Sequence, residues 1–339
     1  MKDKRVLIIY TGGTIGMKKT EKGYAPIKGY LREALNEIED LRREDAPKWD
    51  LVEMSRVLDS SDITVTEWNE IAEVIFENYS SYDGFVVLHG TDTMAYTASA
   101  LSFILEGLEK PVVLTGSQIP LSEMRSDGVD NIVTSLIIAA EGEANEVCLY
   151  FSGKLLRGNR SVKMSADDLV AFDSPNYPHL ADVGITIRYN RPAIGGFERR
   201  PLRLRPFSDI PIGVLKVFPG IQFGLFESIM TDKLSGIVLE TFGAGNIPSS
   251  GGELIPIIKR AFEGGTVIAV CSQCPSGTVS LGTYETSSAL KNAGAVSGFD
   301  MTTEAAVSKL YHLFSIGITK EEIKTKMEED LRGEITPKR

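Results

Sequence analysis

The sequence is poor in cysteine and has no long apolar run. Its three cysteines, Cys148, Cys271 and Cys274, are too few for a disulfide framework, which indicates a reducing compartment. Near the start, the apolar run Val6–Tyr10 ends at Thr11. It is shorter than a secretory leader requires, and far shorter than the about 18 apolar residues that span a membrane. We therefore expect a cytoplasmic chain without membrane contact.

Positive charge is also scarce. The chain carries 36 Lys and Arg against 46 Asp and Glu, a formal net charge of -10 at pH 7. A field of that sign repels phosphate backbones and anionic lipid surfaces. The composition therefore predicts that nucleic acid is not a ligand.

Short apolar runs alternate with amphipathic segments of helical length through the first part of the chain. Runs that are apolar on both faces are typical of parallel strands buried between helices, so the alternation predicts an α/β fold. The expected strands are 6–10, 84–88, 111–114 and 146–151, and the expected helices are 29–41, 66–79, 94–108 and 127–140.

A break in this alternation divides the chain. Prolines at 192, 201, 206 and 211 and glycines at 195 and 196 are typical of a linker. Beyond it we expect strands at 212–218, 236–239 and 266–270 and helices at 253–262, 287–293, 303–315 and 320–331. The prediction is a larger N-terminal domain over 1–190 with a mainly parallel sheet between helices, a linker over 191–211, and a smaller C-terminal α/β domain over 212–339.

Loops that follow strands of a parallel sheet are where reactive groups gather. The first expected strand leads into Thr11–Gly16. Its adjacent glycines let the backbone approach a ligand closely and can offer amide hydrogens to an oxyanion. The loop lacks the Gly-Lys-Ser/Thr of a phosphate-binding loop and the three-glycine spacing of a dinucleotide site, which disfavours nucleotide binding.

Two further polar clusters combine hydroxyls with carboxylates. His89–Thr93 follows the expected strand 84–88, and Asp59–Asp62 precedes the expected helix at 66–79. Each cluster taken alone is equally typical of a helix-capping turn, because Ser, Thr and Asp are favoured there.

A hydroxyl nucleophile needs a base, and conventional bases are few. The only histidines are His89, His179 and His312, and none follows a Gly-x-Ser-x-Gly elbow. We expect His89 to be a packed or hydrogen-bonded loop residue. Lys163 can serve instead if burial or nearby charge makes its neutral form accessible, although a loop lysine is usually a solvated surface charge.

Together these loops resemble the bacterial-type L-asparaginase family, and within it the cytosolic type I branch. Thr11–Gly16 and Asp83–Thr93 are similar to the two family signatures. The similarity runs in order along essentially the whole chain, and it includes Thr115–Pro120, Arg125–Gly128, Arg157–Arg160 and Gly243–Asn246.

The resemblance implies hydrolysis of L-asparagine to L-aspartate and ammonia. Thr14 would attack the side-chain amide and form an acyl-enzyme ester, while Tyr24 would close over the substrate and help to activate Thr14. Thr91, Asp92 and Lys163 would form a second polar group. In it, Lys163 promotes proton removal from Thr91, and Thr91 positions or activates the hydrolytic water. No metal or cofactor is required.

The resemblance also implies how the substrate is held. Asp92 would receive the α-ammonium group, Ser60 and Ser61 the α-carboxylate, and Asn246 would reach across the interface of a homodimer that often pairs into a tetramer. Glu285 aligns too loosely to receive a role. The glutamine side chain is longer by one methylene, and a pocket discriminates against one methylene by only ~1 to 3 kcal/mol. Minor glutaminase activity is therefore compatible with this site. The full set of substrate-binding residues is Asp59, Ser60, Ser61, Thr91, Asp92, Ser117 and Asn246.

Three alternatives stay open. Cys271 and Cys274 have redox-pair spacing, although the following Pro275–Gly277 indicates a loop and not a helix start. A non-catalytic asparagine or aspartate sensor would not need Thr14 or Lys163. The amidase subunit of a tRNA-dependent amidotransferase shares the signatures but carries a domain before the first of them. We therefore expect an enzyme that acts alone.

Overall fold

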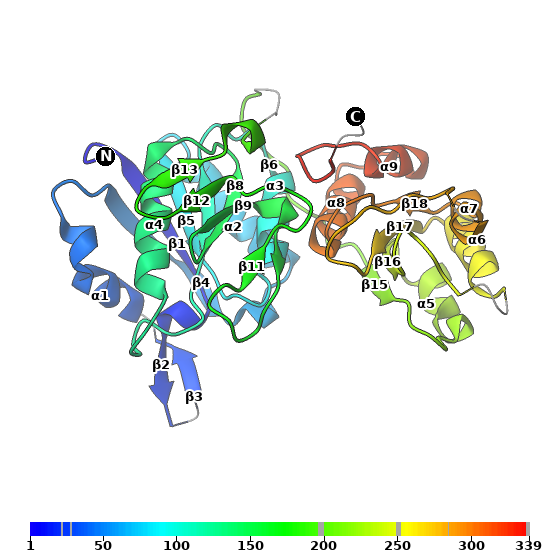
Figure 1. Ribbon diagram of the computed structural model, residues 1–339, viewed down its shortest axis with the longest axis horizontal. Helices are drawn as coiled ribbons and strands as arrows, with labels where there is room; N and C mark the ends of the chain where they lie inside the picture. Colours follow the sequence, from blue (N-terminus) through cyan, green and yellow to red (C-terminus); the bar gives the residue numbers. More distant parts are fainter. Residues whose placement is uncertain (22, 28, 196–199, 249–251, 284, 337–339) are drawn as a thin grey trace. The chain divides into compact units, whose positions relative to one another are not determined.

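The computed structural model describes the chain except residues 22, 28, 196–199, 249–251, 284 and 337–339. The chain divides into two compact units, Met1–Leu204 and Arg205–Arg339. Each unit combines helices with a sheet that contains parallel strands (Figure 1). The predicted fold class, a larger mainly parallel α/β domain followed by a smaller α/β domain, is confirmed.

The described part of the first unit is built on an eight-stranded sheet in the order β13-β12-β9-β8-β7-β5-β1-β4. The strands from β8 to β4 are parallel, whereas β9, β12 and β13 pair antiparallel. The four runs predicted as strands in this unit correspond to β1, β5, β7 and β8. The strands are β1 (Arg5–Gly12), β4 (Lys48–Leu58), β5 (Gly84–Leu88), β7 (Val112–Thr115), β8 (Val147–Phe151), β9 (Lys154–Arg157), β12 (Ala181–Val183) and β13 (Ile187–Tyr189).

Helices cover both faces of this sheet. On one face, Ile8 and Val86 belong to a core cluster that also contains Leu35 of α1 and Leu136 of α4. Successive residues of a strand point to opposite faces, so the residues next to Ile8 and Val86 in their strands point to the other face of the sheet. Helix α3 contacts that face, and α2 packs against α3. Figure 1 shows α4 and α3 on opposite sides of the strands. The helices are α1 (Tyr30–Glu37), α2 (Val65–Asn78), α3 (Met94–Ile104) and α4 (Gly128–Glu141).

The order of the parallel strands reverses between β1 and β5. From β1 the chain moves to β4 at one edge, and from β5 it moves through β7 to β8 in the other direction. Ligands of open parallel sheets bind beyond the carboxyl ends of the strands at such a switch point. The loops after β1 and β5 carry Thr14 and Thr91, so the topology brings both threonine-bearing loops to this place.

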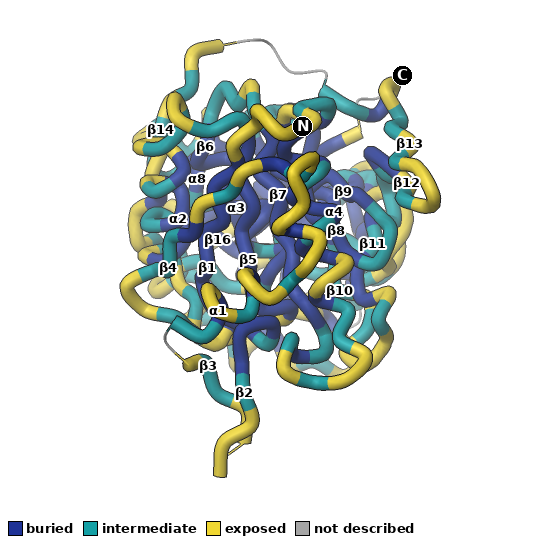
Figure 2. Tube along the Cα trace, turned by 90° about the vertical axis from the view of Figure 1, so that its left-hand side faces the viewer, coloured by how far each residue is buried: buried dark blue, intermediate teal, exposed yellow. Residues whose placement is uncertain are grey.

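A hairpin that the sequence patterns did not predict follows the first loop. Its strands, β2 (Met17–Thr20) and β3 (Gly23–Pro26), pair antiparallel and project away from the rest of the first unit (Figures 1 and 2). Most of its residues are exposed or half-buried. Without a buried face there is no apolar alternation in the sequence, which is the signal that identifies a strand.

The helix predicted over 94–108 is shorter than expected. It ends at Ile104 because Leu105–Glu106 form β6, which pairs with β14 (Arg203–Leu204). The second of these strands lies inside the predicted linker, 191–211, of which residues 196–199 lie outside the described residues. The exact domain boundaries stay a prediction.

The described part of the second unit contains a four-stranded parallel sheet in the order β15-β16-β17-β18. Every strand predicted here from sequence has its counterpart, with shifted ends. Among the described residues, no helix is long and apolar enough to cross a membrane. The elements are β15 (Ile212–Lys216), α5 (Glu227–Asp232), β16 (Gly236–Thr241), α6 (Leu254–Gly264), β17 (Val267–Ser272), α7 (Glu285–Asn292), β18 (Val296–Ser297), α8 (Thr303–Ser315) and α9 (Lys320–Met327).

A fully buried ion pair anchors the end of the second unit. Nζ of Lys309 in α8 lies 2.6 Å from Oε1 of Glu334, and neither side chain is accessible to solvent. The Lys309 ammonium also donates to the carbonyl oxygens of Met327 and Glu329, and the Glu334 carboxylate accepts the backbone N–H of Leu331. Each buried charge is therefore paired and hydrogen-bonded, as burial requires.

Replacing Lys309 by methionine is expected to destabilise the chain by about 3–5 kcal/mol, because it leaves the Glu334 carboxylate buried without its partner. The double variant Lys309→Met/Glu334→Gln removes both charges and is expected to recover part of that loss. Urea unfolding at pH 7 measures both. Equal stability of the wild type and the single variant would show that Lys309 and Glu334 do not form a buried ion pair in solution.

Candidate active site

The loops that carry most of the expected site residues follow neighbouring parallel strands, at the carboxyl ends of those strands in the large sheet. Thr14 begins the short helix η1 (Thr14–Gly16) after β1, and Thr91 lies in the loop after β5. Ser60 begins η3 (Ser60–Asp62) after β4. Ser117 follows β7, which pairs with β5.

Two glycines hold the threonine loops in direct contact. Gly13 has φ +83°, and a Cβ built on it would lie 2.3 Å from both the N and the Cα of Gly90. No side chain fits in that space, so the two backbones touch at this point. Because Thr14 and Thr91 each follow one of these glycines, the contact fixes the spacing between them.

The Gly13 amide does not serve the role expected for it. Its N–H donates to the carbonyl oxygen of Leu58 at 3.1 Å, so it is committed to the backbone of β4. The expectation that the two adjacent glycines offer amide hydrogens to an oxyanion is therefore wrong for Gly13. The glycines serve close packing instead, as a Cβ on Gly12 would lie 1.9 Å from the same Leu58 oxygen.

Lys163 contacts both neighbouring residues of the second signature. Its Nζ lies 2.9 Å from Oγ1 of Thr91 and 2.7 Å from Oδ1 of Asp92. The Lys163 side chain is 18% exposed and that of Asp92 66%, so the lysine is largely buried while the carboxylate faces solvent. The antiparallel pair β10 (Val162–Lys163) and β11 (Phe172–Asp173) holds the lysine in place. Lys163 is thus not a solvated surface charge.

His89 stiffens the loop that carries Thr91. Its Nδ1 lies 2.7 Å from the Gly90 carbonyl oxygen, which can only accept, so Nδ1 carries the proton. Nε2 then accepts from Oγ1 of Thr97 at 2.8 Å, and that oxygen accepts from Nε1 of Trp68 at 3.0 Å. Burial lowers the pKa of His89 to about 4. The ring is neutral at pH 7, which agrees with the packed loop residue expected from sequence.

The serine cluster lies against the same loop. Oγ1 of Thr93 donates to the Ser60 carbonyl oxygen at 2.7 Å, and a Cβ on Gly90 would lie 2.6 Å from Oγ of Ser60. Ser60 is buried, whereas Asp59 and Ser61 are exposed. Asp59 accepts both the N–H and the hydroxyl of Ser61, so it caps η3 and orients Ser61.

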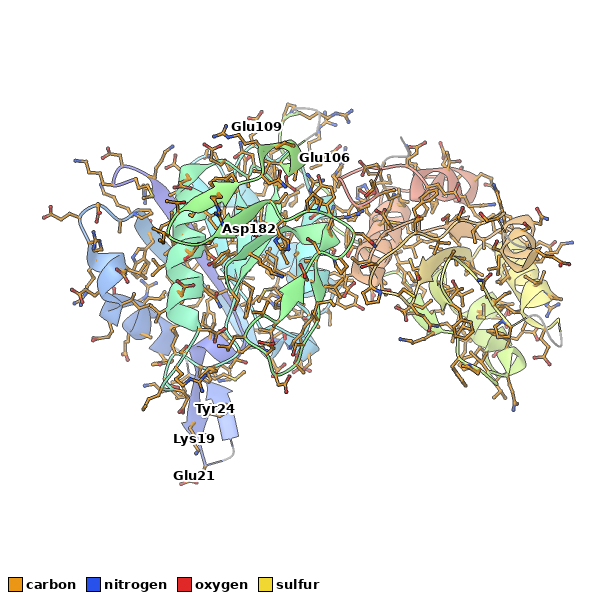
Figure 3. All side chains as sticks on the ribbon, in the orientation of Figure 1. Lys19, Glu21, Tyr24, Glu106, Glu109 and Asp182 are labelled. Carbon is orange, nitrogen blue, oxygen red and sulfur yellow. The ribbon has the colours of Figure 1, made fainter. Side chains whose placement is uncertain are left out.

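Tyr24 lies on β3, which contacts η1, but among the described residues no hydrogen bond joins its side chain to Thr14 or Thr91. It projects from the β2–β3 hairpin, near Lys19 and Glu21 (Figure 3), and is 48% exposed. A hydrogen bond to Glu123 raises the pKa of its hydroxyl. The expected action of Tyr24 on Thr14 stays a prediction.

Two further expected residues, Ser117 and Asn246, lie outside the group formed by Thr91, Asp92 and Lys163. Ser117 is buried, and its hydroxyl has no hydrogen-bond partner among the described residues. Asn246 belongs to the second unit, where its backbone exchanges hydrogen bonds with Phe242. Its reach toward a neighbouring subunit stays a prediction. Glu285, which received no role, begins α7 and is exposed.

The cysteine pair lacks the features of a reactive site. Cys271 is buried at the end of β17, and burial raises the pKa of its thiol to about 12. A redox-active cysteine needs the opposite shift, toward the thiolate. Within the described residues, no three His, Cys, Asp or Glu side chains are arranged to hold a metal ion.

Sequence patterns assigned no role to two residues that support the site. The amide of Gln118 accepts from Oγ1 of Thr91 at 3.1 Å. The carboxylate of Asp127 accepts the backbone N–H groups of Gln118 and Ile119 at 3.0–3.1 Å. Both lie in segments noted for their resemblance, but neither a lone amide nor a helix-preceding aspartate signals such contacts.

Substituting Gly13 by alanine is expected to lower kcat about 100-fold. The new Cβ must push Gly90 away by an ångström or more, and a misplacement of that size at a reacting centre has such an effect. Gly142→Ala is the matched control, because Gly142 also has positive φ but open space around it. The control is expected to lose about 1 kcal/mol of stability and no activity. Equal activity of both variants would contradict the role of the Gly13–Gly90 contact.

Fold and site together define a two-domain α/β protein of enzyme type, with a threonine, a lysine and a carboxylate in contact at the switch point of a parallel sheet. Comparison with known families agrees with this class. The chain belongs to the asparaginase family: the family described as "Asparaginase, N-terminal" matches residues 5–195, and "Glutaminase/Asparaginase C-terminal domain" matches residues 211–327.

Relatives match over nearly the whole chain. L-asparaginase 1 of Escherichia coli (strain K12) is 43% identical over 337 residues, which cover 99% of each chain. The crystal structure of L-asparaginase I from Vibrio cholerae O1 biovar eltor matches with a TM-score of 0.91 at 44% identity, covering 98% of this chain and 99% of the other. The thermostable L-asparaginase from Thermococcus kodakarensis matches with a TM-score of 0.89 at 35% identity, covering 98% of this chain and 100% of the other.

Proposed function

We propose that the chain hydrolyses L-asparagine to L-aspartate and ammonia, with Thr14 as nucleophile. The observation that carries this proposal is the contact of Lys163 with both Thr91 and Asp92, on a loop that touches the Thr14 loop through Gly13. Full-length similarity to proteins named L-asparaginase supports the same substrate.

Acylation requires an activated hydroxyl, because an amide is a poor electrophile. Oγ1 of Thr14 attacks the side-chain carbonyl carbon, the C–N bond breaks, and the threonine proton leaves on ammonia. Tyr24 assists this transfer after its hairpin closes and its hydroxyl exchanges Glu123 for Thr14. Closure also excludes water from the site.

Deacylation takes place on the Thr91 side. Water adds to the ester carbon, the bond to Thr14 breaks, and Thr14 regains a proton. Thr91 positions the water, and the Lys163 ammonium donates to Thr91 Oγ1 and stabilises the partial negative charge that this oxygen gains as it accepts a hydrogen bond from the water. The low exposure of Lys163 strengthens this interaction, because less water screens it.

The substrate is oriented by polar groups of the site that keep a free hydrogen-bonding position for its α-ammonium and α-carboxylate groups. Asp92 uses Oδ1 for Lys163, so its other oxygen receives the α-ammonium group of asparagine. Ser60, Ser61 and the backbone of η3 receive the α-carboxylate, with Asp59 orienting Ser61. The buried Ser117 hydroxyl supplies a further donor.

Assembly and location complete the proposal. We place the chain in the cytoplasm as a homodimer or a dimer of dimers, in which Asn246 of one copy completes the site of another. The division into 1–190, a linker over 191–211 and 212–339 belongs to the same proposal. Sedimentation of the purified chain measures its assembly, and a monomer with full activity contradicts the shared site.

Ammonia release by the purified full chain tests the function directly. L-asparagine is expected to be hydrolysed with a kcat/KM about 10–200-fold above that for L-glutamine, the range that one methylene supports. Release from asparagine needs no added protein partner. No release from asparagine above a buffer control contradicts the proposal.

A further inference from the structure

One side chain joins the Thr91 hydroxyl to the loop that follows Lys163. Oε1 of Gln118 lies 3.1 Å from Oγ1 of Thr91. On its other side, Nε2 of Gln118 lies 3.0 Å from the Asp168 carbonyl oxygen and 3.3 Å from that of Ala166. The amide thus spans the gap between the loop after β5 and the loop that follows β10.

These contacts determine the orientation of the amide. The carbonyl oxygens of Ala166 and Asp168 can only accept, so the NH₂ group of Gln118 must face them. Its oxygen must then face Thr91, whose hydroxyl has to donate. Lys163 donates to the same Thr91 oxygen at 2.9 Å. The hydrogen of Thr91 therefore points to Gln118, one lone pair accepts from Lys163, and the second lone pair stays free.

The backbone beneath Gln118 is also fixed. The carboxylate of Asp127 accepts the N–H of Gln118 at 3.0–3.1 Å and that of Ile119 at 3.0 Å. Asn131 donates from Nδ2 to the same carboxylate at 3.2 Å and to the Gly116 carbonyl oxygen at 3.0 Å. Gln118 is therefore held at both its backbone and its amide before it meets Thr91.

We propose that Gln118 is a positioning residue of the hydrolysis, acting through the hydroxyl of Thr91; this inference rests on the proposed function. By taking the hydroxyl hydrogen, Gln118 keeps the second lone pair of Thr91 free to accept a hydrogen bond from the hydrolytic water. That bond aims the water oxygen at the ester carbon. Without Gln118 the hydroxyl rotates, and its hydrogen can occupy the place of the water.

The substitution Gln118→Met tests this role, because methionine has a similar length and offers neither the donor nor the acceptor of the amide. It is expected to lower kcat for asparagine about 10–100-fold and to lower KM with it, so that kcat/KM changes by less than about threefold, because slower deacylation lets the acyl-enzyme accumulate and leaves acylation unchanged. Gln273→Met is the matched control, because Gln273 also donates to two carbonyl oxygens, those of Val217 and Glu240, but in the second unit. The control is expected to keep wild-type kcat.

Two further variants separate positioning of Thr91 from support of the 166–168 loop. Gln118→Glu keeps the acceptor for Thr91 and loses the donors to that loop, so it is expected to regain part of the activity lost in Gln118→Met. In a Thr91→Val background, Gln118→Met is expected to cause no additional loss, because the hydroxyl it acts on is gone.

The outcomes distinguish this inference from the proposed function. If the wild type releases no ammonia, the proposed function fails, and the inference fails with it. If the wild type is active and Gln118→Met keeps its kcat, only the inference is overturned. The inference is also overturned if Gln118→Met slows the Thr91→Val enzyme as much as it slows the wild type, because its effect then does not pass through Thr91.

Discussion

Replacing Thr14 by alanine is expected to lower kcat for asparagine by about 10⁴-fold or more, the scale seen when a hydrolase loses its nucleophile. Alanine has no hydroxyl to form the ester, and the neighbouring Thr91 cannot replace it, because its hydroxyl already serves Gln118 and Lys163. Coupled detection of ammonia over hours is sensitive enough for the residual rate.

The matched variant for this experiment is Thr14→Ser, which keeps a hydroxyl on the same backbone. It is expected to restore most of the lost activity, since only the methyl group of the nucleophile is missing. The alanine variant should also keep wild-type stability, because Thr14 is half-buried and outside the core clusters. An alanine variant that turns over asparagine at more than about a tenth of the wild-type rate would exclude Thr14 as the nucleophile.

Replacing Lys163 by methionine is expected to lower kcat about 10²–10³-fold, the range for removal of one positioned donor that stabilises developing charge. The change removes the charge beside Thr91 and leaves Asp92 without its partner. Asp92 is largely exposed, so the loss of stability should be small compared with the loss of activity.

Lys154→Met is the control for this second variant. Lys154 is also a partly buried lysine of the first unit, with its Nζ 3.1 Å from Asp173, but it has no contact with Thr91. The control is expected to keep kcat within about twofold, as removal of a partly exposed ion pair changes little. Similar losses in both variants would show that the effect of Lys163→Met comes from general disruption.

The large sheet could be predicted from sequence because its central strands are buried on both faces. Runs such as 84–88 contain only apolar residues and glycine, and this composition leaves little choice of structure. The hairpin of β2 and β3 has no such signal, because most of its residues are exposed or half-buried and its apolar residues do not alternate with polar ones. The end of α3 at Ile104 depends on pairing with residues about a hundred positions later, which no local pattern contains.

For the candidate site, the sequence predicted where several residues lie along the strands but not which side chains contact each other. The positions of Thr14, Thr91 and Asp92 after strands follow from the topology of parallel sheets. The contact of Lys163 with Thr91 spans 72 positions, and only the resemblance suggested it. Nothing in the sequence indicated that Gly13 meets Gly90, that the Gly13 amide is used by Leu58, or that Gln118 directs the Thr91 hydroxyl, because each depends on packing between loops.

Rapid-quench mass spectrometry of the Thr91→Val enzyme mixed with asparagine addresses the central claim most directly. With water positioning impaired, the acyl-enzyme should accumulate, and the peptide that contains Thr14 should carry one additional aspartyl group. The same peptide should stay unmodified in a Thr14→Ala/Thr91→Val control. An aspartyl group found on any other residue, or ammonia release in the first turnover without modification of Thr14, would contradict the account.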